Sequence, residues 1–213
     1  MNDITHPAEI EKKSFEIISR ELSGRQFDLQ NESVIKRVIH TTADFDYADN
    51  LVFSNGPTVI AKDILKNGAK IVTDTQMAKA GINKKAVEKL QCSLYCFIDA
   101  PEVIETAQKN GFTRARAAVD QAAETLKNPV IFVVGNAPTA LIRLHELITN
   151  DIFLPAFIIA VPVGFVNVVE SKELIMGLNI PHIVAKGQKG GSNVAAAICN
   201  ALLYETAGRE GKA

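Results

Sequence analysis

The sequence predicts an α/β protein: a doubly wound, mostly parallel sheet with helices on both faces and an N-terminal helical element. Three observations support this fold class. The first 50 residues show helical apolar spacing, short apolar runs alternate with helical segments from residue 51 onwards, and those runs are nearly continuous, as in strands buried on both faces. No linker, repeat or low-complexity tract breaks the pattern, so residues 1–213 are predicted to form a single domain.

The chain begins with two predicted amphipathic helices. The first runs from about Pro7 to Leu22, with proline in its first turn and a serine-glycine stop after its last residue. In the second, apolar residues at i, i+1, i+4 and i+5 form one stripe over residues 34–39. At about 100° per residue, His40 falls roughly opposite that stripe. It is therefore expected to face solvent, a ligand or a partner chain rather than the core beneath its own helix.

From residue 51 the apolar runs alternate with helical segments. The runs predict strands over residues 51–54, 69–74, 92–98, 129–135, 156–163 and 182–187. The segments between them predict helices that begin near Pro57, Asn83, Pro101, Arg114, Asn136, Val169 and Ser192. In an open parallel sheet a ligand lies beyond the carboxyl ends of the strands, near a topological switch point. The turns that follow the strands are therefore where we expect the functional residues.

Composition and charge restrict the partners. Apolar residues make up 47% of the chain, enough for a full core, and the formal net charge of -1 gives no field that attracts nucleic acid or an anionic membrane. No apolar signal segment opens the chain, and the longest apolar run, residues 155–169, contains two prolines and is shorter than a spanning helix. Three cysteines without metal-type spacing are typical of reduced core residues. These features predict a cytoplasmic protein with neither a nucleic-acid nor a membrane partner.

Several nucleotide, hydrolase and metal motifs are absent from the sequence. The run KGQKGGSN (186–193) lacks the spacing of a phosphate-binding loop, no G-x-G-x-x-G opens the first strand-helix unit, and no G-x-S-x-G marks a serine hydrolase. His40, Asp44 and Asp46 suggest metal ligands, but no second histidine or cysteine cluster accompanies them, and acids there are typical of solvated loops or helix caps. We therefore predict no cofactor and no protein-bound metal.

Polar residues stand at two places where helix patterning does not favour them. Ser14 interrupts the apolar stripe of the first helix, where it either bonds back to a carbonyl of its own helix or marks the opening of a pocket. Arg114 and Arg116 stand at the start of a helix, the end at which the helix dipole disfavours cations. An arginine there is a candidate anchor for an anionic ligand. The turns that lead into helices also suit carboxylates or phosphates.

Six segments carry a resemblance that extends from about residue 7 to residue 203. They are KKSFEII (12–18), RVIHTTADFDYADNLVFS (37–54), FTRARAA (112–118), GNAPTAL (135–141), PVGFVNVVESK (162–172) and KGQKGGSNVAAAICNAL (186–202). In these segments the chain resembles the precorrin-8X methylmutases, or precorrin isomerases, of cobalamin biosynthesis. The resemblance implies a doubly wound α/β domain that forms a homodimer, with active sites close to the subunit interface.

The resemblance also implies an activity, the isomerisation of a contracted tetrapyrrole with several carboxylates. A methyl group moves from C-11 to C-12 of ring C by a formal 1,5-sigmatropic shift, which gives hydrogenobyrinate or its cobalt form, cobyrinate, without a cofactor. The segment HTTADFDYA (40–48) resembles that of family members from the cobalt-inserting branch of the pathway and so favours cobalt-precorrin-8 as the substrate. A suprafacial shift of this kind is thermally allowed. The protein therefore has only to lower its barrier, by protonating the conjugated macrocycle near ring C or by holding it bent.

By the same resemblance, His40 is the catalytic proton donor. A histidine at a helix C-terminus has its protonated form favoured by the helix dipole, and Asp44 and Asp46 are expected to act in the same direction. Position in the shared motifs makes Ser14 and Arg114 substrate contacts, the arginine by pairing with a carboxylate. The further residues assigned to substrate binding are Thr41, Asn136, Gly187, Gly190, Gly191 and Ser192.

Two other functions stay open at this point. A nucleotide- or methyl-donor-dependent transferase is suggested by the fold alone, and the missing fingerprints count against it. A non-catalytic carrier of a corrinoid or other tetrapyrrole would keep the pocket without needing His40. A spectral change of the tetrapyrrole during incubation with the protein distinguishes the isomerase from the carrier.

Overall fold

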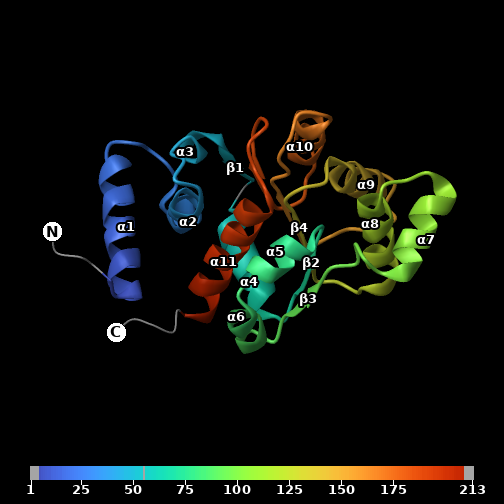
Figure 1. Cartoon of the computed structure of the whole chain (residues 1–213), viewed down its shortest axis with the longest axis horizontal. Coiled ribbons are helices and arrows are strands. Elements are labelled where there is room, and N and C mark those ends of the chain that lie inside the picture. Colours follow the sequence, from blue (N-terminus) through green and yellow to red (C-terminus); the bar gives the residue numbers. More distant parts are fainter. Residues whose placement is uncertain (1–4, 55, 209–213) are drawn as a thin grey trace.

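The computed structural model describes residues 5–54 and 56–208; residues 1–4, 55 and 209–213 of the predicted domain lie outside the described part. In the described part, six strands form one sheet in the order β1-β6-β5-β4-β2-β3. Figure 1 shows this part of the molecule with helices around it. β1 pairs antiparallel with β6, and the other neighbours pair parallel, which confirms the predicted mostly parallel sheet. The strands are β1 (Leu51–Phe53), β2 (Lys70–Thr73), β3 (Ser93–Tyr95), β4 (Val130–Val134), β5 (Phe157–Ala160) and β6 (His182–Ala185).

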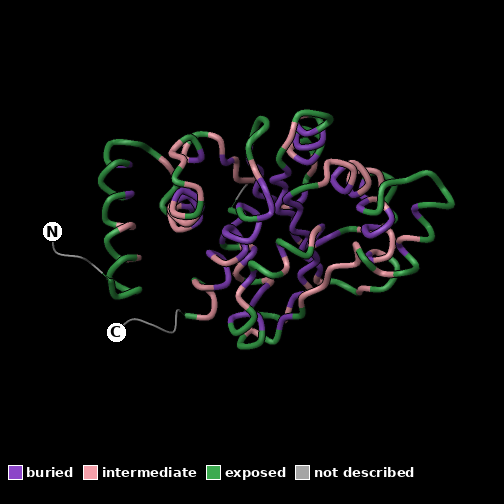
Figure 2. Tube along the Cα trace, viewed as in Figure 1, coloured by how far each residue is buried: buried purple, intermediate pink, exposed green. Residues whose placement is uncertain are grey.

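Helices cover both faces of the sheet, as predicted. Successive side chains of a strand point to opposite faces, so a strand that is apolar throughout needs cover on both. In β4, for example, Ile131 enters one hydrophobic core and Phe132 enters the other. Figure 2 shows the buried residues gathered in the middle of the molecule, along the strands and α11. The first core is covered by α1 (Pro7–Glu21), α2 (Glu32–Thr42), α4 (Pro57–Lys66), α5 (Gln76–Gly81), α6 (Lys84–Lys89) and α11 (Ser192–Ala207). The second is covered by α8 (Arg114–Thr125), α9 (Pro138–Thr149) and α10 (Val168–Met176), with α7 (Pro101–Asn110) packed on α8.

Two single-turn segments flank α2, namely η1 (Leu29–Asn31) before it and α3 (Tyr47–Asn50) after it. The apolar stripe predicted for α2 is buried, with Val34 and Val38 fully enclosed. Among the described residues, none of these helices has the length and apolar character needed to cross a membrane.

The first helix, α1, lies to one side of the molecule and packs on α2 (Figure 1). Its bounds, Pro7–Glu21, agree with the prediction to within one residue. Of its apolar stripe, Ile18 and Leu22 are buried, whereas Ile10 and Ile17 remain 48% and 41% exposed. Apolar surface is therefore left over on α1 after it has packed on α2.

The observed strands are shorter than the apolar runs that predicted them. The run 156–163 contains β5 but continues beyond it: Val161 still donates its N–H to Val134, and Pro162 has no N–H with which to continue the ladder. The prediction also missed α5, which begins after Thr75, whose hydroxyl oxygen accepts a hydrogen bond from the N–H of Ala78. This helix of 6 residues is too short to show apolar periodicity.

The three cysteines differ in burial. Cys92 and Cys199 are buried, in agreement with the prediction of core residues. Cys96, which follows β3, is only half-buried. All three carry free thiols.

The strand order creates a topological switch point between β2 and β4. The chain passes from β2 outward to β3 and returns to β4 on the other side of β2. Open parallel sheets bind their ligands at such a reversal, beyond the carboxyl ends of the strands. Asp74 directly follows β2 there, and Gly135 directly follows β4. At the same edge, β6 leads into α11 through residues 187–192, which we call the glycine turn.

Candidate active site

The histidine that the sequence singled out, His40, stands in the last turn of α2 and is half-buried. It faces α1 rather than the core of the sheet. The hydroxyl oxygen of Ser14 lies 2.8 Å from its Nδ1, and the ring of Phe15 stacks on the imidazole with centroids 5.2 Å apart and planes 17° from parallel. These two contacts fix both the position and the tilt of the imidazole ring.

Ser14 therefore differs from most serines within a helix, whose hydroxyls bond back to a carbonyl of the same helix. The sequence left open whether its hydroxyl bonds back to its own helix or marks a pocket. In α1 it is Ser19 that bonds back, donating to the carbonyl of Phe15 at 2.7 Å, whereas Ser14 reaches across to His40. The structure thus brings together two of the predicted site residues from different helices.

Phe15 and Arg37 support this arrangement, and sequence reasoning missed both. The guanidinium of Arg37 lies 4.7 Å from the centroid of the Phe15 ring and also forms an ion pair with Glu11 at 2.7 Å. It further approaches the ring of Tyr204 on α11, at 5.4 Å. Arg37 therefore ties α1 to α2 and α11. A single sequence holds no signal that pairs a phenylalanine of one helix with an arginine of the next.

The acidic loop after α2 binds a lysine of the glycine turn. The Nζ of Lys189 lies 2.6 Å from a carboxylate oxygen of Asp44 and 2.6 Å from one of Asp46. The hydrogen bond from Lys189 lowers the pKa of Asp44, and the two acids raise the pKa of Lys189. The sequence predicted that these acids favour protonated His40; in the structure both of them pair with Lys189.

The glycine turn is shaped by steric limits as well as by hydrogen bonds. A Cβ atom on Gly190 would overlap the backbone carbonyl oxygen of Val161, so only glycine fits there. Gly191 has φ 134°, and Gly187 has φ 71°, which are conformations that favour glycine. At the end of the turn, the hydroxyls of Ser192 and Thr75 lie 2.8 Å apart. This contact connects the turn to the switch point between β2 and β4.

A cavity of about 500 Å³ opens at that switch point. Arg114 and Asn136, both assigned to substrate binding, line it together with Thr75 and Asp99. The guanidinium of Arg114 reaches the carboxylate of Asp99 at 3.3 Å, and both side chains are more than half exposed. An exposed ion pair of this kind is weak, so an incoming carboxylate can replace it.

Asp74 explains the shape of the turn after β4; the sequence placed it in one of the turns where functional residues are expected but assigned it no contact. Its carboxylate accepts hydrogen bonds from the N–H groups of Gly135 at 3.0 Å, Asn136 at 2.7 Å and Ala137 at 2.8 Å. Burial raises the pKa of Asp74, and the three N–H groups partly offset that effect. Those backbone donors are therefore occupied, and Asn136 offers the cavity its side chain rather than its N–H.

The second arginine of α8 does not belong to the cavity. Arg116 forms two hydrogen bonds to the carboxylate of Glu146, at 3.1 and 2.9 Å, and lies 4.6 Å from the centroid of the Phe112 ring. It connects α8 with α9. Thr41, in the last turn of α2, is exposed and donates to the carbonyl of Arg37 at 2.9 Å; its assignment to substrate binding stays a prediction.

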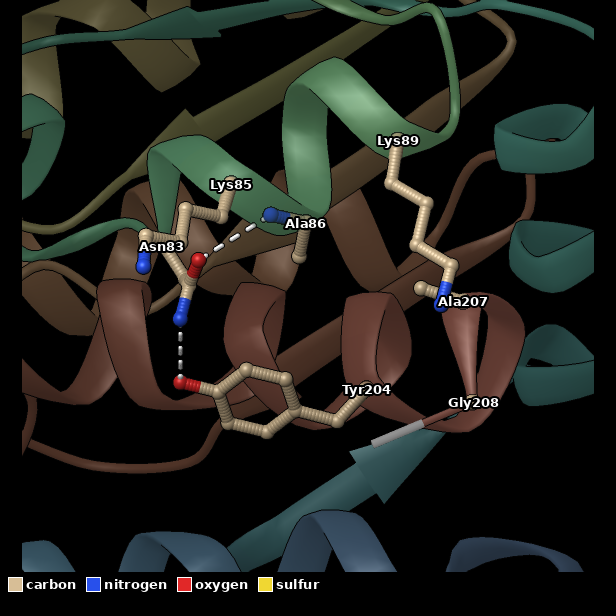
Figure 3. A pocket seen from close by; sticks show the side chains of 7 residues that line it. All are labelled: Asn83, Lys85, Ala86, Lys89, Tyr204, Ala207 and Gly208. Carbon is tan, nitrogen blue, oxygen red and sulfur yellow. Dashed lines mark hydrogen bonds between the residues drawn. The ribbon is translucent and has the colours of Figure 1, made fainter. Parts of the chain in front are cut away.

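Two further cavities are lined by residues that were not assigned to the site. One of about 310 Å³, shown in Figure 3, lies between α6 and the end of α11, where the amide of Asn83 donates to the hydroxyl of Tyr204 at 3.2 Å. Another of about 570 Å³ is lined by Phe15, Arg37 and Tyr204 among others. α11 leaves the carboxyl edge of the sheet at its first residue, so Tyr204 lies roughly three turns further, towards the opposite edge. Neither cavity is lined by His40 or by a residue assigned to substrate binding.

The chain matches known proteins over nearly its full length. The family model described as precorrin-8X methylmutase matches residues 9–205. The cobalt-precorrin-8 methylmutase of Salmonella typhimurium is 47% identical over 210 residues, covering 96% of this chain and 98% of that protein. The precorrin-8X methylmutase of Pseudomonas aeruginosa is 36% identical, covering 92% and 94%.

The solved structures agree with the sequence matches. A crystal structure of the precorrin-8X methylmutase from Thermus thermophilus superposes with a TM-score of 0.86 at 36% identity, covering 93% of this chain and 97% of that one. Fold, family match and relatives all point to the same assignment. This chain belongs to the precorrin-8X methylmutase family, the methyl-shifting isomerases of cobalamin biosynthesis.

Proposed function

We propose that this chain converts cobalt-precorrin-8 to cobyrinate and that His40 donates the proton that promotes the methyl shift. The observation that carries this proposal is the pair formed by His40 and Ser14, whose Nδ1 and Oγ atoms lie 2.8 Å apart. An imidazole held by a hydrogen bond and a stacked ring needs little reorganisation before it transfers a proton. Its place at the C-terminal end of α2 adds support, because the helix dipole favours the protonated form there.

In this mechanism the proton makes the conjugated macrocycle electron-poor at the migration terminus. The methyl group then moves with its bonding electrons, so the bond to C-11 breaks as the bond to C-12 forms. The proton returns to His40 after the shift, and no atom is gained or lost overall. The protein contributes orientation and acid catalysis and needs no redox partner.

The carboxylates of the substrate are proposed to bind along the carboxyl edge of the sheet. Arg114 supports this because it lines the switch-point cavity and its ion pair with Asp99 is weak and exposed. The cobalt form is proposed because several relatives are named cobalt-precorrin-8 methylmutases. The residues proposed to contact the substrate are Ser14, Thr41, Arg114, Asn136, Gly187, Gly190, Gly191 and Ser192.

Replacing His40 tests the role of the acid. His40→Ala is expected to lower kcat by about 10²–10⁴-fold, while the melting temperature and cobyrinate affinity stay near those of the wild type. Ser14→Ala is expected to lower kcat by roughly tenfold or less, because a neutral hydrogen bond that orients the ring is lost. Absorption spectra that follow the conversion of cobalt-precorrin-8 provide the measurement.

Ser19→Ala is the matched control, since Ser19 lies on the same helix and donates to the Phe15 carbonyl of that helix rather than to His40. It should leave turnover unchanged. A His40→Ala variant that turns over within about threefold of the wild type would exclude His40 as the proton donor. A wild type that binds the pigment without converting it would instead indicate a carrier.

We further propose that residues 1–213 form one domain, that two copies pair close to the active sites, and that the protein works in the cytoplasm. The exposed Ile10 and Ile17 support pairing through α1, the helix that also carries Ser14. Three free thiols are consistent with a reducing compartment.

A further inference from the structure

A buried lysine, Lys172 of α10, lies beneath the glycine turn. The residue is 1% exposed. Its Nζ donates hydrogen bonds to the backbone carbonyl oxygen of Gly187 at 2.7 Å and to that of Lys189 at 2.8 Å. Both acceptors belong to the turn, and among residues 5–54 and 56–208 no side chain forms a hydrogen bond with this ammonium group.

The burial of this ammonium group is costly unless its hydrogen bonds compensate. In the described part of the chain no acidic side chain forms an ion pair with Lys172. Burial lowers its pKa to about 8, so the group still carries its proton at neutral pH. A methionine would fill the same space without that cost. What lysine adds is a charged donor that holds two carbonyl oxygens at once.

A second lysine ties the same turn to the helix that carries His40. Lys189, whose carbonyl accepts from Lys172, extends its own ammonium group to Asp44 and Asp46. These acids follow α2 directly, and His40 stands in the last turn of α2. A continuous series of contacts thus leads from α10 through the glycine turn to the end of α2.

We propose that Lys172 is a positioning residue for the isomerisation: it holds the glycine turn at a fixed place relative to His40, so that the turn meets a substrate carboxylate while His40 meets the ring. The inference rests on the proposed function of this site. Lys172 acts through the turn and touches no reacting atom. In such an arrangement a displacement of about 1 Å costs on the order of 10²-fold in rate.

A purely structural role predicts a different behaviour. If Lys172 only stabilised the fold, its loss would lower the melting temperature and leave the folded molecules with normal affinity and kcat. A positioning role instead couples Lys172 to Lys189, because both act on the same turn. Coupling of this kind appears as non-additive effects when the two residues are changed together.

The experiment compares Lys172→Met, Lys189→Met and the double variant, with Lys127→Met as the control. Lys127 is exposed and precedes β4 at the amino edge of the sheet, so its change removes one positive charge far from the turn. Each protein is measured for melting temperature, for affinity to cobyrinate by absorption titration, and for kcat with cobalt-precorrin-8.

Lys172→Met is expected to weaken cobyrinate binding and to lower kcat, each by about tenfold, in molecules that remain folded at the assay temperature. Lys189→Met should show a smaller loss of the same kind. The double variant should resemble Lys172→Met rather than the product of the two single effects. Lys127→Met should behave as the wild type.

Normal affinity and kcat in folded Lys172→Met, or effects that multiply in the double variant, would overturn the positioning role. If Lys172→Met does not fold, Lys189→Met carries the test, since its side chain is 44% exposed, and unchanged affinity and kcat in that variant overturn the inference. A wild type that neither binds cobyrinate nor converts cobalt-precorrin-8 would reject the proposed function itself. If only the positioning role is wrong, the wild type still binds cobyrinate and converts cobalt-precorrin-8.

Discussion

At the scale of single residues, two neighbouring arginines of α8 allow a sharp test of substrate anchoring. Arg114 lines the switch-point cavity and pairs with Asp99 at 3.3 Å, whereas Arg116 is held twice by Glu146. Arg114→Ala is expected to weaken cobyrinate binding by about tenfold and to change kcat at saturation much less, because a carboxylate clamp acts on ground and transition states alike. Absorption titration and steady-state kinetics measure the two effects separately.

Arg116→Ala is the matched control for this prediction. It breaks the connection between α8 and α9, so it is expected to lower the melting temperature while the folded protein keeps its affinity. Equal affinities of Arg114→Ala and the wild type would show that Arg114 does not contact the substrate.

The buried Lys172 gives a pH-dependent stability. Burial lowers its pKa from 10.5 to about 8 in the folded protein. Between these two values the unfolded chain binds more protons than the folded one, so the contribution of Lys172 to stability rises with pH across that window. Below pH 8 the free energy of unfolding carries the full cost of burying the charged Lys172 side chain, roughly 3 kcal/mol. Above 10.5 the penalty is gone.

Comparison with Lys172→Met isolates this contribution from other groups that titrate at high pH, such as Cys199. Denaturant unfolding of both proteins at pH 7, 8.5 and 10 is the measurement. The free energy of unfolding of the wild type, relative to the variant, is expected to increase steadily over this series. A difference that stays flat would mean that Lys172 keeps an ordinary pKa.

At the scale of the element, the glycine turn combines a steric demand with its proposed role in binding. A Cβ atom on Gly190 would overlap the carbonyl oxygen of Val161, whereas one on Gly187 meets nothing within 4 Å. Gly190→Ala is therefore expected to lower the melting temperature strongly. Gly187→Ala should cost only about 1–2 kcal/mol, the strain of its positive φ. Thermal unfolding of the two variants, side by side, checks this.

The same geometry limits what bulky substitutions reveal about binding. A loss of pigment affinity in a Gly190 variant cannot be separated from a displaced backbone, so Gly187 is the better position at which to probe contact with the substrate. If Gly190→Ala melts like the wild type, the turn adapts more easily than the packing against Val161 indicates.

Most of the elements could be predicted from local pattern. The near-continuous apolar runs located the strands, and the stripe of α2 is buried as expected. The errors have two different causes, a proline that was included in a predicted strand and a helix too short to show a period. Residues beyond Val161 are apolar yet leave the ladder at Pro162, and α5 is too short to display a period.

At the scale of the whole molecule, the exposed face of α1 bears on oligomeric state. Ile10 and Ile17 remain 48% and 41% exposed on the helix that covers His40. If two copies pair through this face, Ile17→Glu is expected to produce a monomer of 23.1 kDa, while the wild type has about twice that mass. Light scattering coupled to size exclusion measures the masses, and a wild type that is already monomeric contradicts the proposed dimer.

The contacts that assemble the site could not be predicted from the sequence alone. The family resemblance supplied His40, Ser14 and Arg114, but no local rule pairs Ser14 with His40. Lys189 meets Asp44 only because β1 returns antiparallel alongside β6 and places the ends of α2 and β6 at one edge. Such pairs depend on the closed fold, and a single sequence records only their members.

The unequal burial of the cysteines has a consequence for thiol labelling. Cys199 is enclosed in the core, where burial raises the pKa of its thiol to about 12, and burial also raises the pKa of Cys92, so a maleimide meets little thiolate at either position. Cys96 is half-buried and lies two residues before Ile98, which lines the switch-point cavity. The chain as it stands therefore accepts a fluorophore preferentially beside the cavity. A coloured tetrapyrrole in the cavity is expected to quench that dye, so the fluorescence reports occupancy of the cavity. The sequence contains no tryptophan that could give such a signal, and the dye supplies it without any engineered mutation.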